Sequence, residues 1–241
     1  MSGKKYLIKC PTKSSNESLI EGHGRVSVIF GGMDMKVLLI NGSPHEKGCT
    51  FTALSEVEKA LLDEGIESEL FWIGKEPIAG CMACRACTKL GKCVINDGVN
   101  ELSERIGEFD GVVIGSPVYY SNAAGTLRCF LDRFFYSGAG KKLAGKPGAA
   151  VVSCRRGGAT ATFDEINKYF TISNMPVVSS NYWNQIHGNT ADEAKQDLEG
   201  LHTMRVLGHN MAWLLKCIEA GKEKGITWKL SEPKVMTNFI R

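Results

Sequence analysis

From Met35 onward, short apolar runs alternate with amphipathic segments, and this alternation is the strongest constraint on the fold. Residues 36–41 (KVLLIN) are rich in branched side chains, as buried strands are, and residues 50–64 carry apolar or small side chains at helical spacing. Strands are predicted at 36–41, 69–73, 111–115, 148–153 and 176–179, and helices at 50–64, 100–109, 125–135, 163–170 and 192–220. Such alternation predicts an α/β fold, a mostly parallel sheet with helices on both of its faces.

The ends of the chain do not follow this pattern. Residues 1–34 form a predicted N-terminal extension, residues 35–221 the main domain and residues 222–241 a C-terminal tail. Residues 25–30 have the composition of a short strand. The extension is equally consistent with an added strand, an arm that contacts a partner, or translation from an upstream start codon.

Charge and hydropathy restrict the partners. The 29 Lys and Arg residues exceed the 26 Asp and Glu residues by only three, which argues against nucleic acid or an anionic membrane as the main partner. No apolar run approaches the roughly 18 residues of a membrane helix, and no signal-peptide core follows Lys4 and Lys5. We therefore expect a cytoplasmic protein, in which nine cysteines indicate metal, cluster or redox chemistry rather than disulfides.

Ligands of such sheets bind at the carboxyl ends of the strands, so the loops there carry the functional prediction. After the first strand comes NGSPHEKGCT, residues 41–50, followed by a helix. The helix N-terminus, the glycines and the hydroxyls of Ser43 and Thr50 suit a phosphate. Cys49 follows Gly48 where a nucleotide triphosphate loop needs lysine, and GxGxxG is not matched. The alternative is a tight turn and helix cap without a ligand.

The loop after the third strand, GSPVYYSN at residues 115–122, combines a rigid turn with aromatic side chains. Tyr119 and Tyr120 can stack on a planar ring or can pack against the following helix. After the fourth strand comes CRRGGAT at residues 154–160, where Gly157 and Gly158 permit close backbone approach to a ligand. The two arginines of that loop suit a phosphorylated cosubstrate or a solvated surface.

Together these three loops resemble those of the NADPH-dependent FMN reductase family, from Met35 to about Gly221. The resemblance implies a three-layer flavodoxin-like fold with a five-stranded parallel sheet of order 2-1-3-4-5, and FMN as cofactor. Cys49 stands where the family usually has asparagine, which removes one amide but leaves the backbone donors. The FMN-binding residues are then expected to be Ser43, His45, Gly48, Cys49, Thr50, Pro117, Val118, Tyr119, Tyr120, Gly157 and Gly158.

Cysteines 81, 84, 87 and 93 form a compact C-x2-C-x2-C-x5-C motif. Gly91 lets the chain return, so that Cys81, Cys84, Cys87 and Cys93 can surround one centre such as a [4Fe–4S] cluster. The motif resembles that of the iron–sulfur flavoproteins, a branch of the same family. Zinc, or thiols that pack without any metal, are the alternatives.

If FMN is bound, the flavin carries the chemistry and no side chain needs to be catalytic. The first hypothesis is an NAD(P)H-dependent FMN oxidoreductase that passes electrons to a small-molecule or protein acceptor. The second is an electron carrier that uses FMN and the cluster without direct NAD(P)H oxidation, and the third is a non-catalytic flavin-binding protein. The resemblance also implies a homodimer or homotetramer.

Overall fold

The computed structural model describes residues 35–230, 232–233 and 235–237. The chain divides into two units, residues 1–33 and 34–241, and the description below concerns the second. The N-terminal extension, with the strand predicted at 25–30, lies outside the described residues.

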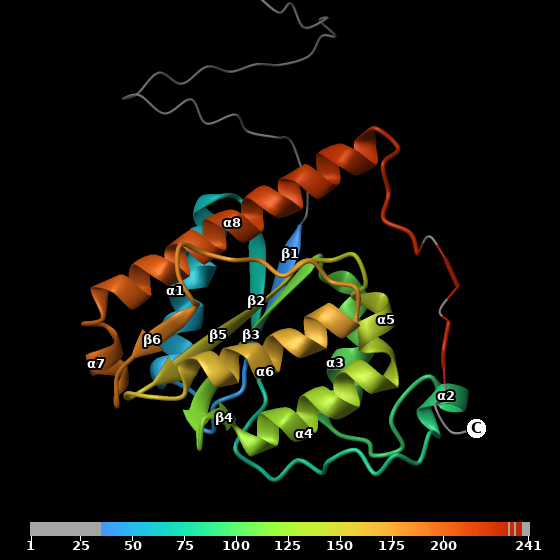
Figure 1. Ribbon diagram of the computed structural model, residues 1–241, viewed down its shortest axis with the longest axis horizontal. Coiled ribbons are helices and arrows are strands. Elements are labelled where there is room, and N and C mark those ends of the chain that lie inside the picture. Colours follow the sequence, from blue (N-terminus) through green and yellow to red (C-terminus); the bar gives the residue numbers. More distant parts are fainter. Residues whose placement is uncertain (1–34, 231, 234, 238–241) are drawn as a thin grey trace, which may run out of the picture. The chain divides into compact units, whose positions relative to one another are not determined.

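The sheet has the predicted architecture (Figure 1). Its parallel strands follow the order β2-β1-β3-β5-β6, which is the predicted 2-1-3-4-5 order once a two-residue strand is set aside. These strands are β1 (Lys36–Asn41), β2 (Glu67–Trp72), β3 (Gly111–Tyr119), β5 (Gly148–Cys154) and β6 (Gln185–His187). The extra strand, β4 (Asn122–Ala123), pairs antiparallel with the end of β3 and was not predicted.

The fifth parallel strand was predicted at the wrong place. Residues 176–179 make only one isolated bridge, between Val177 and Gly148, and Val177 stays 40% exposed. The edge of the sheet is formed instead by β6, of which only Ile186 is fully buried. A three-residue edge strand with one buried side chain has almost no hydrophobic periodicity to detect.

Helices cover both faces of the sheet, with α1 and α8 on one side and α3, α4 and α6 on the other (Figure 1). The bounds are α1 (Cys49–Asp63), α2 (Cys87–Leu90), α3 (Gly98–Arg105), a 3-10 turn (Ile106–Glu108), α4 (Gly125–Phe134), a π-helical turn (Phe135–Ala139), α5 (Gly140–Lys142), α6 (Ala159–Ile172), α7 (Ala191–Ala194) and α8 (Leu198–Glu223). Leu38 and Ile40 of β1 lie in one apolar cluster with Phe130 and Phe134 of α4. This core fixes where each strand ends, and so positions the loops beyond the sheet.

The helix ends have identifiable causes. Gly65 ends α1 as predicted, with a left-handed φ of 74°. The helix predicted at 192–220 is two helices, α7 and α8. Asp197 is the N-cap residue of α8, and its carboxylate accepts a hydrogen bond from the Gly200 amide at 2.9 Å. In the described part of the chain no helix is long and apolar enough to cross a membrane.

The close contact between α8 and α1 depends on Gly208. A Cβ at this position would lie 2.6 Å from the Ala60 Cβ and 2.8 Å from the Val57 carbonyl oxygen. We expect Gly208→Ala to lower the free energy of unfolding by about 1–3 kcal/mol, because overpacking outweighs the gain in helix propensity. Gly221→Ala on the same helix is the control, since its Cβ would approach no atom closer than 3.6 Å. Urea denaturation should show the first variant destabilised and the second unchanged or more stable.

Candidate functional site

A cleft of about 700 Å³ lies at the carboxyl edge of the sheet. Its size is within the usual range for cofactor pockets. The loops after β1, β3, β5 and β6 form its walls, and the lining residues are Ser43–Thr50, Pro117, Val118, Tyr119, Ser153, Cys154, Arg155, Gly188, Asn189, Thr190 and Ala191. The predicted phosphate loop and the loop after the third strand therefore meet in one cleft.

The loop after β1 is held in shape by its own side chains and by one residue of β2. The Asn41 carboxamide accepts a hydrogen bond from the Ser43 amide at 3.1 Å and donates one to the Glu46 carbonyl at 2.9 Å. Ser43 Oγ accepts from the His45 amide at 3.1 Å, and Trp72 Nε1 donates to the Ser43 carbonyl at 2.8 Å. The loop is thus preorganised, and Trp72 is a contributor that the sequence did not reveal.

The N-terminus of α1 opens into this loop. Gly48 is the N-cap residue and supplies no side-chain hydrogen bond to the helix. The first N–H groups of a helix have no intrahelical partner and carry partial positive charge, so they can bind an anion. This helix end therefore offers free N–H donors to an anion in the cleft.

Side chains next to this helix end tie it to the far side of the cleft. Thr50 Oγ1 and Ser153 Oγ lie 2.8 Å apart, and the Cys49 thiol donates to the Gly188 carbonyl at 3.5 Å. Burial raises the pKa of the Cys49 thiol, and burial together with Asp197 raises the pKa of the Cys154 thiol. Both shifts favour the neutral thiol over the negatively charged thiolate in this cleft.

The remaining predicted residues lie outside the cleft lining. Tyr120 is fully exposed, and a Cβ added at Gly157 would meet no atom within 4 Å. Gly158 starts α6 with a φ of 91° and packs against the turn between β3 and β4. The loop after β6, residues 188–191, also lines the cleft but was not predicted to do so, because β6 itself was not predicted. Two sequence signals were present in it, since Gly188 is typical of a turn and Thr190 caps a helix.

Gly158 is expected to be sensitive to substitution. An added Cβ would lie 2.7 Å from Ser121 Oγ and 2.9 Å from Val118 Cγ1, in addition to the strain of its positive φ. We expect Gly158→Ala to destabilise the fold by about 1–3 kcal/mol and to displace Val118 from the cleft wall. Gly157→Ala is the matched control and should change neither thermal stability nor FMN affinity measured by fluorescence quenching.

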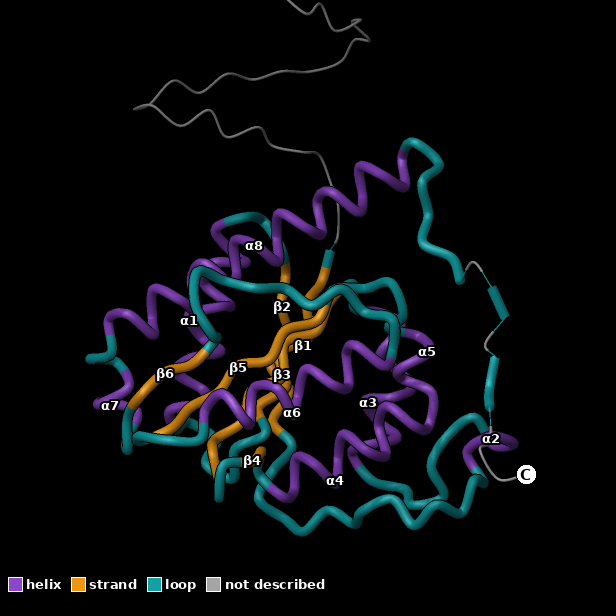
Figure 2. Tube along the Cα trace, viewed as in Figure 1, coloured by secondary structure: helices purple, strands orange, loops and turns teal. Residues whose placement is uncertain are grey.

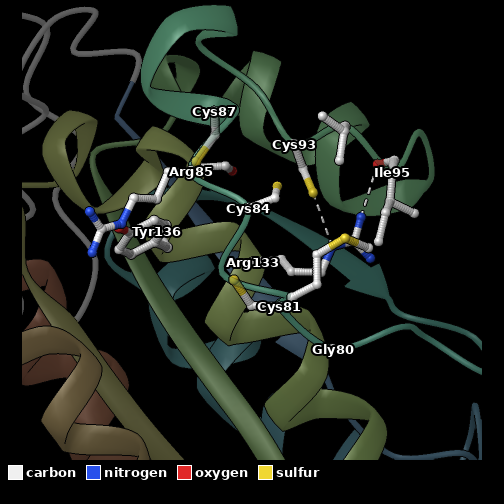
Figure 3. A pocket seen from close by; sticks show the side chains of 12 residues that line it. Gly80, Cys81, Cys84, Arg85, Cys87, Cys93, Ile95, Arg133 and Tyr136 are labelled. Atoms are coloured by element: carbon white, nitrogen blue, oxygen red, sulfur yellow. Dashed lines mark hydrogen bonds between the residues drawn. The ribbon is translucent and has the colours of Figure 1, made fainter.

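Cys81, Cys84, Cys87 and Cys93 surround a second, smaller hollow (Figure 3), whose lining also includes Arg133 and Tyr136. They lie in the segment between β2 and α3, which is loop except for the single turn of α2 (Figure 2). Ala83 and Arg85 adopt left-handed φ angles of 55° and 58°, which curl the chain between the cysteines. The hollow thus collects all members of the predicted motif.

The chemistry of this donor set fits an iron–sulfur cluster. All four cysteines are free thiols, with Cys81 and Cys84 exposed and Cys87 and Cys93 partly buried. Within the described residues, no group of three His, Cys, Asp or Glu side chains stands ready to hold a metal ion. The exposed part of the loop would have to close further for four thiolates to share one cluster.

The hollow and the cleft lie near opposite ends of α4. Gly125 begins α4 shortly after β3, whose last residues line the cleft, and Arg133, at the other end of α4, lines the hollow. Ten residues of α-helix separate these ends by about 15 Å. In Figure 1, α2 lies beyond the C-terminal end of α4.

The parallel sheet of order β2-β1-β3-β5-β6 with helices on both faces has the flavodoxin-like fold, and the chain adds a compact four-cysteine motif to it. The model of the NADPH-dependent FMN reductase family matches residues 35–190. The chain belongs to this family, and its relatives place it in the iron–sulfur flavoprotein branch.

Two such relatives and one solved structure illustrate the similarity. An iron–sulfur flavoprotein of Methanocaldococcus jannaschii is 35% identical over 77% of this chain and 100% of its own length. An iron–sulfur flavoprotein of Methanosarcina thermophila is 29% identical over 79% of this chain and 100% of its own. The crystal structure of RosB with bound 8-demethyl-8-formylriboflavin-5'-phosphate superposes with a TM-score of 0.61 at 16% identity, covering 86% of this chain and 92% of that chain.

Proposed function

We propose that the protein is an FMN-dependent electron-transfer protein in which the cleft binds FMN and the four-cysteine motif holds a [4Fe–4S] cluster. The observation that carries the proposal is that one hollow is lined by all four cysteines of the motif, Cys81, Cys84, Cys87 and Cys93. Full-length relatives named iron–sulfur flavoproteins support it. The electron acceptor is a protein or a small molecule that contacts the surface near one of the two sites.

In this proposal the N-terminus of α1 binds the FMN phosphate. Ser43, Gly48, Cys49 and Thr50 contribute backbone or hydroxyl groups there, and His45 lies on the same rim. The Thr50 hydroxyl keeps its Ser153 partner at 2.8 Å and so holds the helix end at a fixed place. No large rearrangement of this loop is needed, because Asn41 and Trp72 already fix its backbone.

The flavin ring occupies the other part of the cleft in this proposal, against Pro117, Val118 and Tyr119. Tyr119 lines the cleft and is 44% exposed, so part of its side chain is accessible for stacking on a ring. Tyr120 and Gly158 contribute through the shape of the β3–β4 turn and the start of α6, whereas Gly157 borders open space. When bound, FMN supplies the hydride and electron chemistry, while the chain orients it and donates hydrogen bonds to it.

The second candidate is direct reduction of FMN by NAD(P)H. Arg155 lines the cleft and can attract a phosphorylated cosubstrate to it. The family description also supports this candidate. In that case the cysteine motif would be dispensable for NAD(P)H oxidation, which makes the two candidates distinguishable.

The visible spectrum of the anaerobically purified protein, recorded before and after addition of NADPH, tests the proposal. We expect flavin bands on a broad absorption of thiolate-bound iron, with slow bleaching by NADPH. Flavin bands without the iron absorption, bleached rapidly by NADPH, would support the second candidate instead. Protein that takes up neither FMN nor iron on reconstitution would exclude both.

A further inference from the structure

Arg133, on α4 beside the cysteine hollow, is the largest fully buried side chain of the described residues. Only 1% of its side chain is accessible to solvent. Burial of a guanidinium is costly unless its N–H groups find partners. The contacts of the Arg133 guanidinium must therefore compensate for the cost of burying it.

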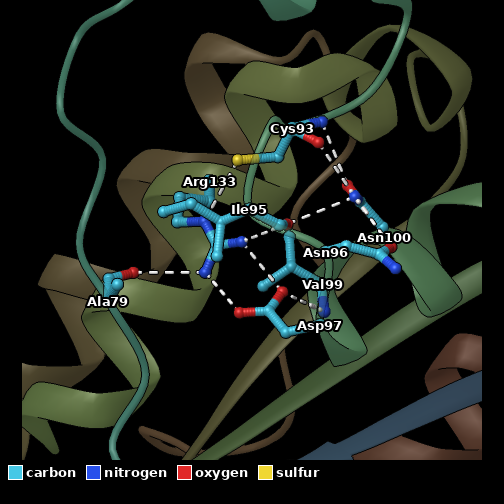
Figure 4. Close-up of polar contacts among 8 residues, drawn as sticks. All are labelled: Ala79, Cys93, Ile95, Asn96, Asp97, Val99, Asn100 and Arg133. Carbon is cyan, nitrogen blue, oxygen red and sulfur yellow. Dashed lines mark hydrogen bonds and ion pairs between the residues drawn. The ribbon is translucent and has the colours of Figure 1, made fainter.

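All five donors of the guanidinium can be accounted for (Figure 4). Two nitrogens bind the Asp97 carboxylate at 2.6 and 2.8 Å, and the same nitrogens donate to the carbonyls of Ala79 at 3.3 Å and Ile95 at 2.9 Å. The fifth donor, Nε–H, points to the sulfur of Cys93 at 3.3 Å. One side chain thus joins the segment before Cys81, the segment after Cys93 and a cysteine sulfur.

The backbone of Cys93 is held from a second direction. Asn100 of α3, which is 3% exposed, accepts a hydrogen bond from the Cys93 amide at 3.0 Å and donates one to the Cys93 carbonyl at 2.9 Å. Asp97 in turn caps α3 by accepting from the Val99 amide at 3.1 Å. Cys93 is consequently anchored to α3 and α4, whereas Cys81 and Cys84 lie exposed in the loop.

From this geometry we propose that Arg133 is a positioning residue for the iron–sulfur cluster, which fixes the Cys93 sulfur as the preformed ligand and hydrogen-bonds to it in the loaded protein. The inference rests on the proposed function. A hydrogen bond from a cation to a ligating sulfur stabilises the more negative, reduced cluster, so it raises the reduction potential. Lysine cannot replace arginine here, because it lacks the two parallel N–H groups that bind both oxygens of the Asp97 carboxylate and has no donor at the Nε position.

The test compares wild-type protein with Arg133→Gln, Arg133→Lys and Arg205→Gln after anaerobic reconstitution with iron and sulfide. Arg205 is the control, an exposed arginine of α8 with its own ion pair to Glu56 at 3.1 Å. We expect both Arg133 variants to show a more negative cluster reduction potential and roughly 10–100-fold faster loss of iron to a chelator. Arg205→Gln should match the wild type in both measurements.

A measurement on the wild-type chain covers the case in which the Arg133 variants do not fold. Protein grown with arginine ¹⁵N-labelled in the guanidinium group and reduced to its paramagnetic state should show a ¹⁵N coupling in pulsed electron paramagnetic resonance. The coupling should persist in the variant Arg85→Lys, which removes the other arginine that lines the hollow. A loaded wild type without this coupling, or Arg133 variants with unchanged potential, would overturn the role of Arg133 and leave the proposed function intact. A wild type that binds no iron and sulfide would overturn both.

Discussion

Cys84→Ser is expected to abolish cluster binding and, with it, electron transfer between FMN and the acceptor. A serine hydroxyl is a poor iron ligand at neutral pH, and the remaining three thiols of the motif cannot complete a four-thiolate set. Because Cys84 is exposed in the loop, the substitution should leave the fold intact. Iron and acid-labile sulfide should fall to background while FMN remains bound, as measured by metal analysis and flavin absorption.

Cys217→Ser provides the control for this prediction. Cys217 is another exposed free cysteine, but it lies on α8 and not in the hollow. It should retain iron, sulfide and electron transfer at wild-type levels. If Cys84→Ser kept its full iron content, or oxidised NADPH and passed electrons on as fast as the wild type, the carrier function would be wrong and the NAD(P)H-dependent reductase would be favoured.

Cys49→Asp is expected to lower FMN affinity by about three orders of magnitude. A carboxylate at the first position of α1 would lie close to the proposed phosphate site, and like charges about 4 Å apart repel by about 4 kcal/mol at an effective dielectric constant of 20. The helix N-terminus favours this carboxylate, whereas burial and the nearby Glu193 disfavour a negative charge at this position, so we expect the apoprotein to remain folded without a gain in stability. Quenching of FMN fluorescence measures the affinity, and thermal unfolding of the apoprotein measures the stability.

Cys49→Asn separates charge from shape in this experiment. Asparagine has nearly the size of aspartate, carries no charge and restores the side-chain amide usual in the family. We expect it to bind FMN as well as the wild type or better. Equal affinities for the aspartate and asparagine variants would show that the phosphate does not bind at this helix end.

The alternation of apolar runs with amphipathic segments was sufficient to predict a mostly parallel sheet with helices on both faces, because buried parallel strands such as β1, β3 and β5 have strong local signals. The strand order was predicted from the family resemblance and not from this alternation. β6 was missed because an edge strand with one buried residue has no such signal, while residues 176–179 mimic one. Short-range composition thus predicts the centre of a sheet better than its edge.

The residues of the candidate sites likewise divide into those that have a local sequence signal and those that do not. Ser43 and Thr50 were predicted because glycines and hydroxyls just before a helix indicate a phosphate site, and Cys49 was predicted from the family resemblance; all three line the cleft. Trp72 and Arg133 were not predicted, because each acts across a long sequence separation: Trp72 binds the Ser43 carbonyl 29 residues away, and Arg133 contacts Cys93 40 residues away. Contacts of this kind arise only when the sheet brings separate segments together.

The most direct test of the central claim is the cofactor content of wild-type protein purified and reconstituted without oxygen. FMN is measured by absorption after release, and iron and acid-labile sulfide are measured chemically on the same sample. We predict about one FMN, four iron and four sulfide per chain, as one flavin and one [4Fe–4S] cluster require. Protein that binds FMN but takes up no iron or sulfide under these conditions would contradict the account.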